Sequence, residues 1–174
     1  MSRIATGLGI ALAVAGLSGV LVGCGGSAAD KNVAVNPIDA AFIAKAEAIC
    51  APVLDYNASH PNPYPSFDYN HPDAATMKLE GAFFSASPFN AALAQLVALP
   101  APQTNAPSWT ALTTTAAALR TQSLKQNAAA LAGDVTTFTA TIAPISSLAT
   151  MLQINAYQAG FADTSSCARL FSSG

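Results

Sequence analysis

The apolar stripe between Val135 and Ala159 constrains the fold of this chain more than any other sequence feature. Its apolar positions follow one another in steps of three and four without a break: Val135, Phe138, Ile142, Ile145, Ala149, Leu152, Ala156 and Ala159. This spacing is one face of an α-helix. Gly160 predicts the end of that helix, and Pro144 inside it predicts a modest kink. A helix with one apolar face is stable when that face packs against another element.

Three further segments show the same helical spacing. The first is predicted to begin at Asn36-Pro37, a capping residue followed by a proline at the first helical position, and to end near Asn57. The second, over 73–99, is predicted to break or kink at Ser87-Pro88, because proline removes a backbone donor and clashes with the preceding turn. The third is predicted over 107–132.

The third and fourth segments are joined by Gly133 and Asp134, a helix-ending glycine followed at once by a new cap. So short a joint predicts an antiparallel helical hairpin. No convincing alternation of apolar and polar residues predicts a strand. Four helical segments, followed by a short tail over 165–171, therefore predict an all-α protein that folds as an up-down antiparallel four-helix bundle.

The N-terminal region has the layout of an export signal. Arg3 opens the chain, and an uncharged apolar stretch then runs from Ile4 to Val22. It ends in Leu21-Val22-Gly23-Cys24, which resembles the bacterial lipobox. The resemblance implies that the chain is cut before Cys24 and that a lipid is attached to its thiol. An uncleaved N-terminal membrane helix is the alternative, since the stretch is nearly long enough to span a bilayer.

Three domain boundaries follow from the lipobox. We expect a lipoprotein signal peptide over 1–23, a lipidated flexible tether over 24–35 and a helical bundle domain over 36–174. Palmitate is the kind of acyl chain that such an anchor carries. The mature protein would then lie on the extracytoplasmic face of the cell membrane.

The cysteines fit the same interpretation. Three cysteines leave one unpaired thiol in an exported protein. If Cys24 carries lipid, Cys50 and Cys167 remain, and an oxidising envelope favours their pairing. A disulfide between the first and last elements would close a long loop. In the chain-entropy model, such a loop stabilises the folded state by about 4 to 5 kcal/mol. A pair of free cysteines or a metal site is the competing interpretation, although no CxxC or CxxH spacing lies nearby.

The segment over 56–72 differs in kind from the helices, because its four prolines prevent regular helix. Aromatic and proline side chains offer rigid contact area of the kind used in recognition. A candidate binding surface therefore comprises Tyr56, His60, Tyr64, Phe67, Tyr69 and His71. The favoured alternative is that these rings fold back over one end of the bundle and complete its core.

Catalytic and metal-binding patterns are weak. His60 and His71, with Asp55, Asp68 and Asp73 nearby, make a metal site conceivable, but the pattern favours solvated loop histidines, and no metal or cofactor is expected. No nucleophile elbow, phosphate-binding glycine loop or dinucleotide fingerprint occurs. Asp39 and Glu47 are too far apart on one helix to act as a carboxylate pair, and we expect both to be solvated.

The charge distribution argues against nucleic acid as a partner. The chain has a formal net charge of −2 and no basic patch. Together with the missing catalytic constellation, this favours a protein that is not an enzyme.

Several sequence elements resemble those of the small alanine-rich helical lipoproteins of actinobacteria, mycobacteria in particular. Besides the lipobox, they are Phe42-Ile43, Ile49-Cys50, Leu96 to Pro102 with Trp109, Ala156 to Phe161 and Cys167-Ala168. These motifs are structural: a cysteine pair, a proline-containing turn and core aromatics. The resemblance therefore implies an exported helical domain and carries over no catalytic residue.

Taken together, the sequence favours a lipid-anchored cell-envelope protein that acts as a binding or accessory module. Its expected partners are the membrane, through the lipid on Cys24, and an envelope protein or cell-wall glycan. The alternative is a carrier of a small apolar ligand or lipid held between the helices, because many core positions are alanine and leave room for a cleft.

Overall fold

The computed structural model of the protein describes residues 39–172, which form six helices and no strand. Their bounds are α1 Ala40–Ser59, α2 Ala74–Ala86, α3 Phe89–Ala98, α4 Ala106–Ala132, α5 Val135–Ala159 and α6 Ser166–Ser172. The all-α class is confirmed. The predicted signal peptide, Cys24 and the tether lie outside the described residues.

Six helices replace the four predicted segments for two reasons. The second segment divides into α2 and α3, because Ser87 precedes Pro88 and takes an extended backbone, with ψ 138°. The Ser87 Oγ then accepts a hydrogen bond from the Phe89 amide at 3.3 Å, which supports the new helix start. The predicted tail is itself helical and forms α6. Six helices do not by themselves confirm the up-down four-helix topology.

Within the described residues the first helix starts at Ala40, and the predicted start at Pro37 lies outside them. Asp39 is its cap, and its carboxylate accepts a hydrogen bond from the Ala41 amide at 2.9 Å. The predicted cap, Asn36, lies outside the described residues. The helix ends at Ser59 because His60 precedes Pro61, which disfavours helical backbone at His60.

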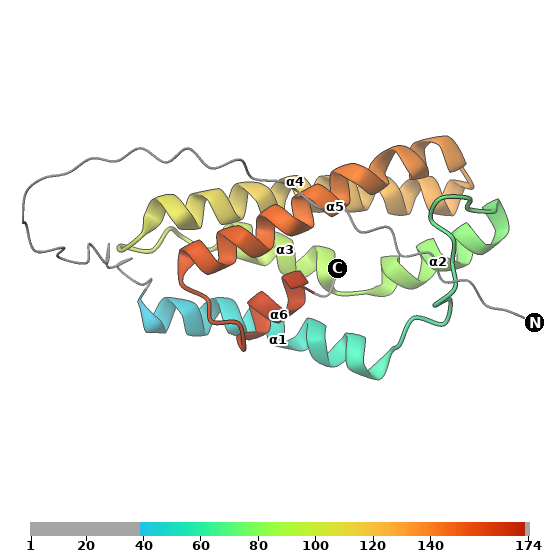
Figure 1. Cartoon of the computed structure of the whole chain (residues 1–174). Helices are drawn as coiled ribbons and strands as arrows, with labels where there is room; N and C mark the ends of the chain where they lie inside the picture. Colours follow the sequence, from blue (N-terminus) through green and yellow to red (C-terminus); the bar gives the residue numbers. More distant parts are fainter. Residues whose placement is uncertain (1–38, 173–174) are drawn as a thin grey trace, which may run out of the picture. The chain divides into compact units, whose positions relative to one another are not determined.

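The long helices α4 and α5 form the antiparallel hairpin that the sequence predicts (Figure 1). Gly133 ends α4 in the left-handed conformation, with φ 75°, where a side chain would be strained. Asp134 caps α5, since its side chain accepts a hydrogen bond from the Thr137 amide at 3.0 Å. α2 and α3 both pack on α4, whereas α1 packs on α3 and α6.

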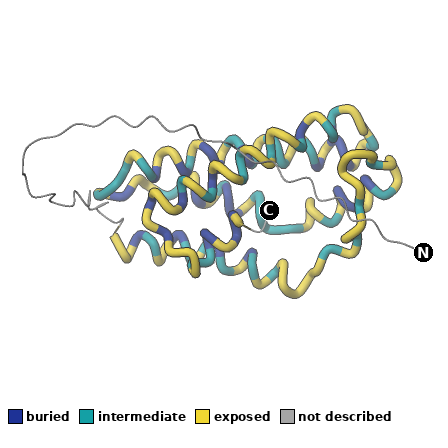
Figure 2. The backbone as a smooth tube through the Cα atoms, in the orientation of Figure 1, coloured by how far each residue is buried: buried dark blue, intermediate teal, exposed yellow. Residues whose placement is uncertain are grey.

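The buried residues lie mainly where the helices face one another (Figure 2). The larger apolar cluster joins α1, α3, α4, α5 and α6 around Trp109, which is 2% exposed and packs edge-on against Phe42. A smaller cluster lies between α2 and the hairpin and contains Met77, Ala129, Ala130 and Phe138.

A disulfide joins Cys50 of α1 to Cys167 of α6, with 5.1 Å between their Cα atoms, and confirms the predicted pairing. Both cysteines are fully buried. The expectation that Glu47 is a solvated surface residue was wrong. Its carboxylate lies half-buried beside the bridge and accepts hydrogen bonds from the backbone amides of Ser166 and Cys167, which otherwise have no partner at the start of α6.

Candidate functional site

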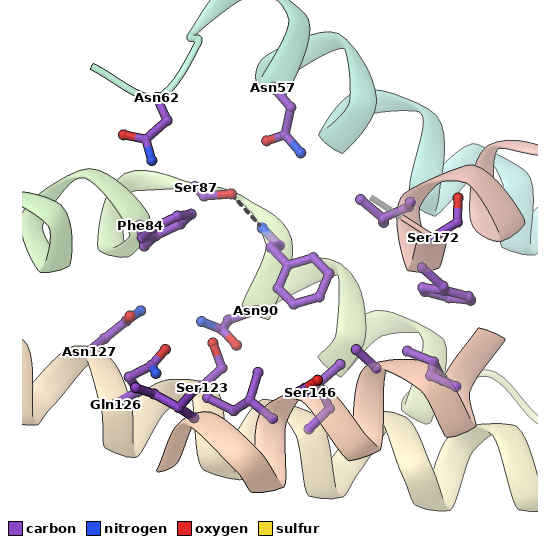
Figure 3. Close-up of a pocket in the computed structure, with 18 of the residues that line it drawn as sticks. Asn57, Asn62, Phe84, Ser87, Asn90, Ser123, Gln126, Asn127, Ser146 and Ser172 are labelled. Carbon is purple, nitrogen blue, oxygen red and sulfur yellow. Dashed lines mark hydrogen bonds between the residues drawn. The ribbon is translucent and has the colours of Figure 1, made fainter. Parts of the chain in front are cut away.

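A cavity of about 660 Å³ lies between the C-terminal part of α1 and the α4–α5 hairpin (Figure 3). All six helices and the loop between α1 and α2 contribute side chains to its wall. α1 is tied to α6 by the disulfide at Cys50, whereas Tyr56 and Asn57, further along α1, face the cavity. The space therefore opens where α1 leaves the packed core.

Much of the wall is apolar and aromatic. These side chains come from α2, α3, α4, α5 and α6: Phe83, Phe84, Phe89, Leu119, Ile142, Ile145, Leu152, Leu170 and Phe171. Leu119 and Leu152 are at most 3% exposed, so this part of the wall is continuous with the larger apolar cluster. Such a surface binds apolar groups by removing them from water.

The polar part of the wall consists of amides and hydroxyls. Asn90, Ser123, Gln126 and Asn127 lie on the α3–α4 side (Figure 3). Asn127 is buried, and the Oδ1 atom of Asn90 is shielded from solvent and has no hydrogen-bond partner within residues 39–172. A buried carbonyl oxygen without a partner loses the hydrogen bonds that water would supply. This oxygen therefore lies beneath the surface of the wall, although the Asn90 side chain as a whole lines the cavity.

The cavity has a mouth formed by exposed residues. Asn57 and His60, at the end of α1, and Ser172, at the end of α6, line it and are exposed to solvent. On the hairpin side, Ser146 and Thr150 of α5 are exposed as well. A molecule can therefore enter between α1 and α5 without disrupting the packed core.

Glu80 of α2 places a carboxyl group behind the wall, with the residue only 1% exposed. Its Oε1 atom accepts hydrogen bonds from Tyr69 Oη at 2.8 Å and from Asn62 Nδ2 at 3.0 Å. Its Oε2 atom has no partner in the described part of the chain. Because Tyr69 and Asn62 both line the cavity, Glu80 fixes two wall residues from the loop.

Tyr69 contacts two aromatic rings as well as Glu80. Its ring stacks on Phe138 of α5, with 6.2 Å between ring centroids, and meets Phe67 edge-on at 4.7 Å. Burial, and then the hydrogen bond to Glu80, raise the pKa of the Tyr69 phenol well above its usual value of 10.0, since both disfavour the phenolate. The loop is thereby attached to α2 and α5.

The six residues of the candidate binding surface separate into two groups. Tyr56, His60 and Tyr69 line the large cavity, and the rings of Tyr56 and His60 stack at 4.2 Å. Tyr64, Phe67 and His71 line a smaller hollow of about 330 Å³ under the loop. The structure therefore does not bring all six together into one surface.

The two histidines lie in different surroundings, His60 at the large cavity and His71 at the smaller hollow. Over residues 39–172, no three His, Cys, Asp or Glu side chains lie close enough together to hold a metal ion. His71 pairs with Asp68 through Nδ1 at 3.1 Å, and both are exposed. The hydrogen bonds that Asp68 accepts, first from the Asn70 amide and then from His71, lower its pKa below 3.8.

Sequence reasoning missed two polar residues at this site, the buried Glu80 and the half-buried Asn90. Neither Glu80 nor Asn90 was singled out from the sequence. A signal for Glu80 was present, since it lies three residues after Met77 and one before Gly81, both on the buried face of α2. Asn90 gave no such signal, because an amide near a helix start is common.

No known protein family, curated protein or solved structure matches this chain.

Proposed function

We propose that this protein binds one small, largely apolar molecule in the central cavity and holds it at the outer face of a bacterial membrane. The cavity is the observation that carries the proposal. Its volume of about 660 Å³ lies within the range of about 300–1,000 Å³ that is usual for small-molecule sites. Its wall also has the usual composition, mainly apolar and aromatic with a few polar side chains that fix orientation.

Two features favour this carrier function over recognition of a protein or glycan by the loop. Phe67 and Tyr69, two of the rings expected to offer contact area, pack against Phe138, and Tyr69 is 37% exposed. Asn62 and Tyr69 of the loop line the cavity, so the loop supports this site. A partner at the exposed ends of α1 and α6 would then act on the mouth, by delivering or accepting the bound molecule.

The membrane location rests on the sequence. The lipobox-like run that ends at Cys24 supports a lipid anchor, and the tether over 24–35 would let the domain reach a partner. Among the described helices, α5 is long and apolar enough to cross a bilayer by length and composition, but it pairs with α4. We therefore assign the anchor to Cys24 and not to α5.

The test is titration with N-phenyl-1-naphthylamine, an uncharged probe whose fluorescence rises in apolar surroundings. The full chain carrying Cys24→Ala, purified without detergent, should bind it saturably at one site. Ala149→Phe fills the cavity from α5 and should abolish binding. Ala143→Phe, the same change at an exposed α5 position outside the wall, should leave binding unchanged.

Equal binding by both variants would show that the probe sits elsewhere. Absence of saturable binding to the parent chain would remove the proposed function.

A further inference from the structure

We propose that the molecule held in the cavity is a single-chain amphiphile, with its apolar chain on the buried floor and its polar head group in water at the mouth. This inference rests on the proposed function and names the class of ligand. Three properties of the described wall carry it: the wall is apolar where it is deep, polar where it is exposed, and without acidic or basic side chains that would select the charge of a head group.

The deepest part of the wall is almost entirely apolar. Of the described lining residues, five are buried, and four of these belong to the larger apolar cluster: Leu119, Leu152, Leu170 and Phe171. The fifth, Asn127, is 9% exposed and lies about two turns along α4 from Leu119. An apolar chain on this floor leaves water and meets mainly apolar side chains, which is favourable in proportion to the area covered.

The exposed part of the wall is mainly polar. Seven described lining residues are exposed, and five of these carry amide, imidazole or hydroxyl groups: Asn57, His60, Ser146, Thr150 and Ser172. Figure 3 shows Asn57 and Ser172 on one side of the cavity and Ser146 on the other. The half-buried Asn90, Ser123 and Gln126 are intermediate in exposure. Polarity in the wall therefore rises toward the solvent.

This gradient matches a molecule that is apolar at one end and polar at the other. A wholly apolar molecule would leave apolar surface in water at the mouth, and a wholly polar one would lose its hydration on the floor without replacing it. An amphiphile with its head group outward avoids both costs. Its apolar chain supplies the binding free energy.

The wall does not select the sign of the head-group charge. No Asp, Glu, Lys or Arg is among the described residues that line the cavity. The carboxyl of Glu80 lies behind Asn62 and Tyr69 and accepts hydrogen bonds from both. A head group that stays in water is neither desolvated nor paired with a fixed charge. Anionic, cationic and uncharged head groups are therefore expected to bind alike.

The first experiment compares ligands on the full chain carrying Cys24→Ala at neutral pH, by displacement of N-phenyl-1-naphthylamine, each ligand below its aggregation concentration. Laurate, undecylamine and monolauroylglycerol carry apolar chains of equal length and should bind within about threefold of one another. Laurate should bind about tenfold more tightly than decanoate, because each buried methylene contributes roughly fourfold. 12-Hydroxydodecanoate, with a hydroxyl at the end that reaches the floor, should bind at least about tenfold more weakly than laurate.

A matched pair of variants locates the head group. Thr150→Lys places a positive charge at an exposed position of the mouth and should make laurate bind at least about threefold more tightly than undecylamine at low ionic strength. Thr136→Lys makes the same change at an exposed α5 position outside the described wall, about 21 Å along the helix. It should leave the two ligands equal.

Three results would each overturn the assignment of an outward-facing amphiphile and leave the proposed function intact. They are binding of 12-hydroxydodecanoate as tight as that of laurate, a difference of more than about tenfold between laurate and undecylamine on the parent chain, and equal effects of the two lysine variants. Binding of the fluorescent probe that none of the amphiphiles displaces would overturn it in the same way. Failure of the probe itself to bind would remove the proposed function as well.

Discussion

At the level of single residues, Glu80 connects the loop to the helices. Its Oε1 atom receives two hydrogen bonds from the loop, from Asn62 and Tyr69, while the residue itself is buried in α2. Removing one partner of a buried carboxyl leaves the other unsatisfied. Tyr69 is the more informative partner, because its ionisation can be followed with pH.

The Tyr69 phenol should contribute a pH-dependent part of the stability. Its folded-state pKa is raised above the unfolded value of 10.0 by burial and by Glu80, so its contribution is fully present below pH 10.0 and is lost as pH rises through the folded-state pKa. Tyr69→Phe should flatten this alkaline loss. Urea unfolding at a series of pH values measures this loss of unfolding free energy. The control is Tyr157→Phe, which changes an exposed tyrosine of α5.

An alkaline loss of stability that is the same in both variants would contradict the role of Tyr69.

Gly81 should be required for the contact between α2 and α4. A Cβ atom at this position would lie 2.5 Å from the Cβ of Ala130, closer than two carbons approach. Gly81→Ala should therefore lower the free energy of unfolding by about 1–3 kcal/mol. Adding Ala130→Gly removes the clashing atom and should recover part of the loss, as measured by urea unfolding. No recovery in the double variant would show that the strain arises elsewhere.

At the level of elements, the helix ends were largely predictable because proline, glycine and aspartate mark them. Gly133 and Gly160 end α4 and α5 at the predicted residues, and the break at Ser87-Pro88 is present. These signals act through local backbone geometry, which the sequence specifies directly. The start of α6 was not predictable in this way, because its cap is supplied by Glu47 from α1.

The contact between Glu47 and α6 should stabilise the attachment of the last helix to the first. Glu47→Ala removes the acceptor for the Ser166 and Cys167 amides and should lower the free energy of unfolding by about 1–2 kcal/mol. Asp55→Ala changes an exposed acid on the same helix and should have little effect. Chemical denaturation of both variants measures the difference. Equal effects would show that charge, and not capping, is responsible.

For the whole molecule, the bridge between Cys50 and Cys167 fixes α1 to α6 and so helps to hold the cavity open. Cys50→Ala should lower the free energy of unfolding by about 2–5 kcal/mol, because 117 residues separate the two cysteines. The variant should remain attached to the membrane. Cys24→Ala should instead be released in soluble form and unfold like the parent chain. Fractionation followed by urea unfolding tests both, and the reverse result would contradict both cysteine assignments.

The cavity could not be located from the sequence. Helical periodicity identifies which face of each segment is buried, but it does not say how closely two faces approach. Here α1 packs on α3 and α6, while its end at Tyr56 and Asn57 faces open space across from α5. That separation depends on contacts between distant residues, such as Glu80 with Asn62. The alanine-rich core indicated room for a cleft without giving its position.

The most direct test of the account is native mass spectrometry of the protein purified from its own cell envelope. We expect a population that carries one bound small molecule per chain, lost in Ala149→Phe and kept in Ala143→Phe. A parent chain that carries no bound molecule, or a bound mass that Ala149→Phe retains, would contradict the proposal that the central cavity is a ligand site.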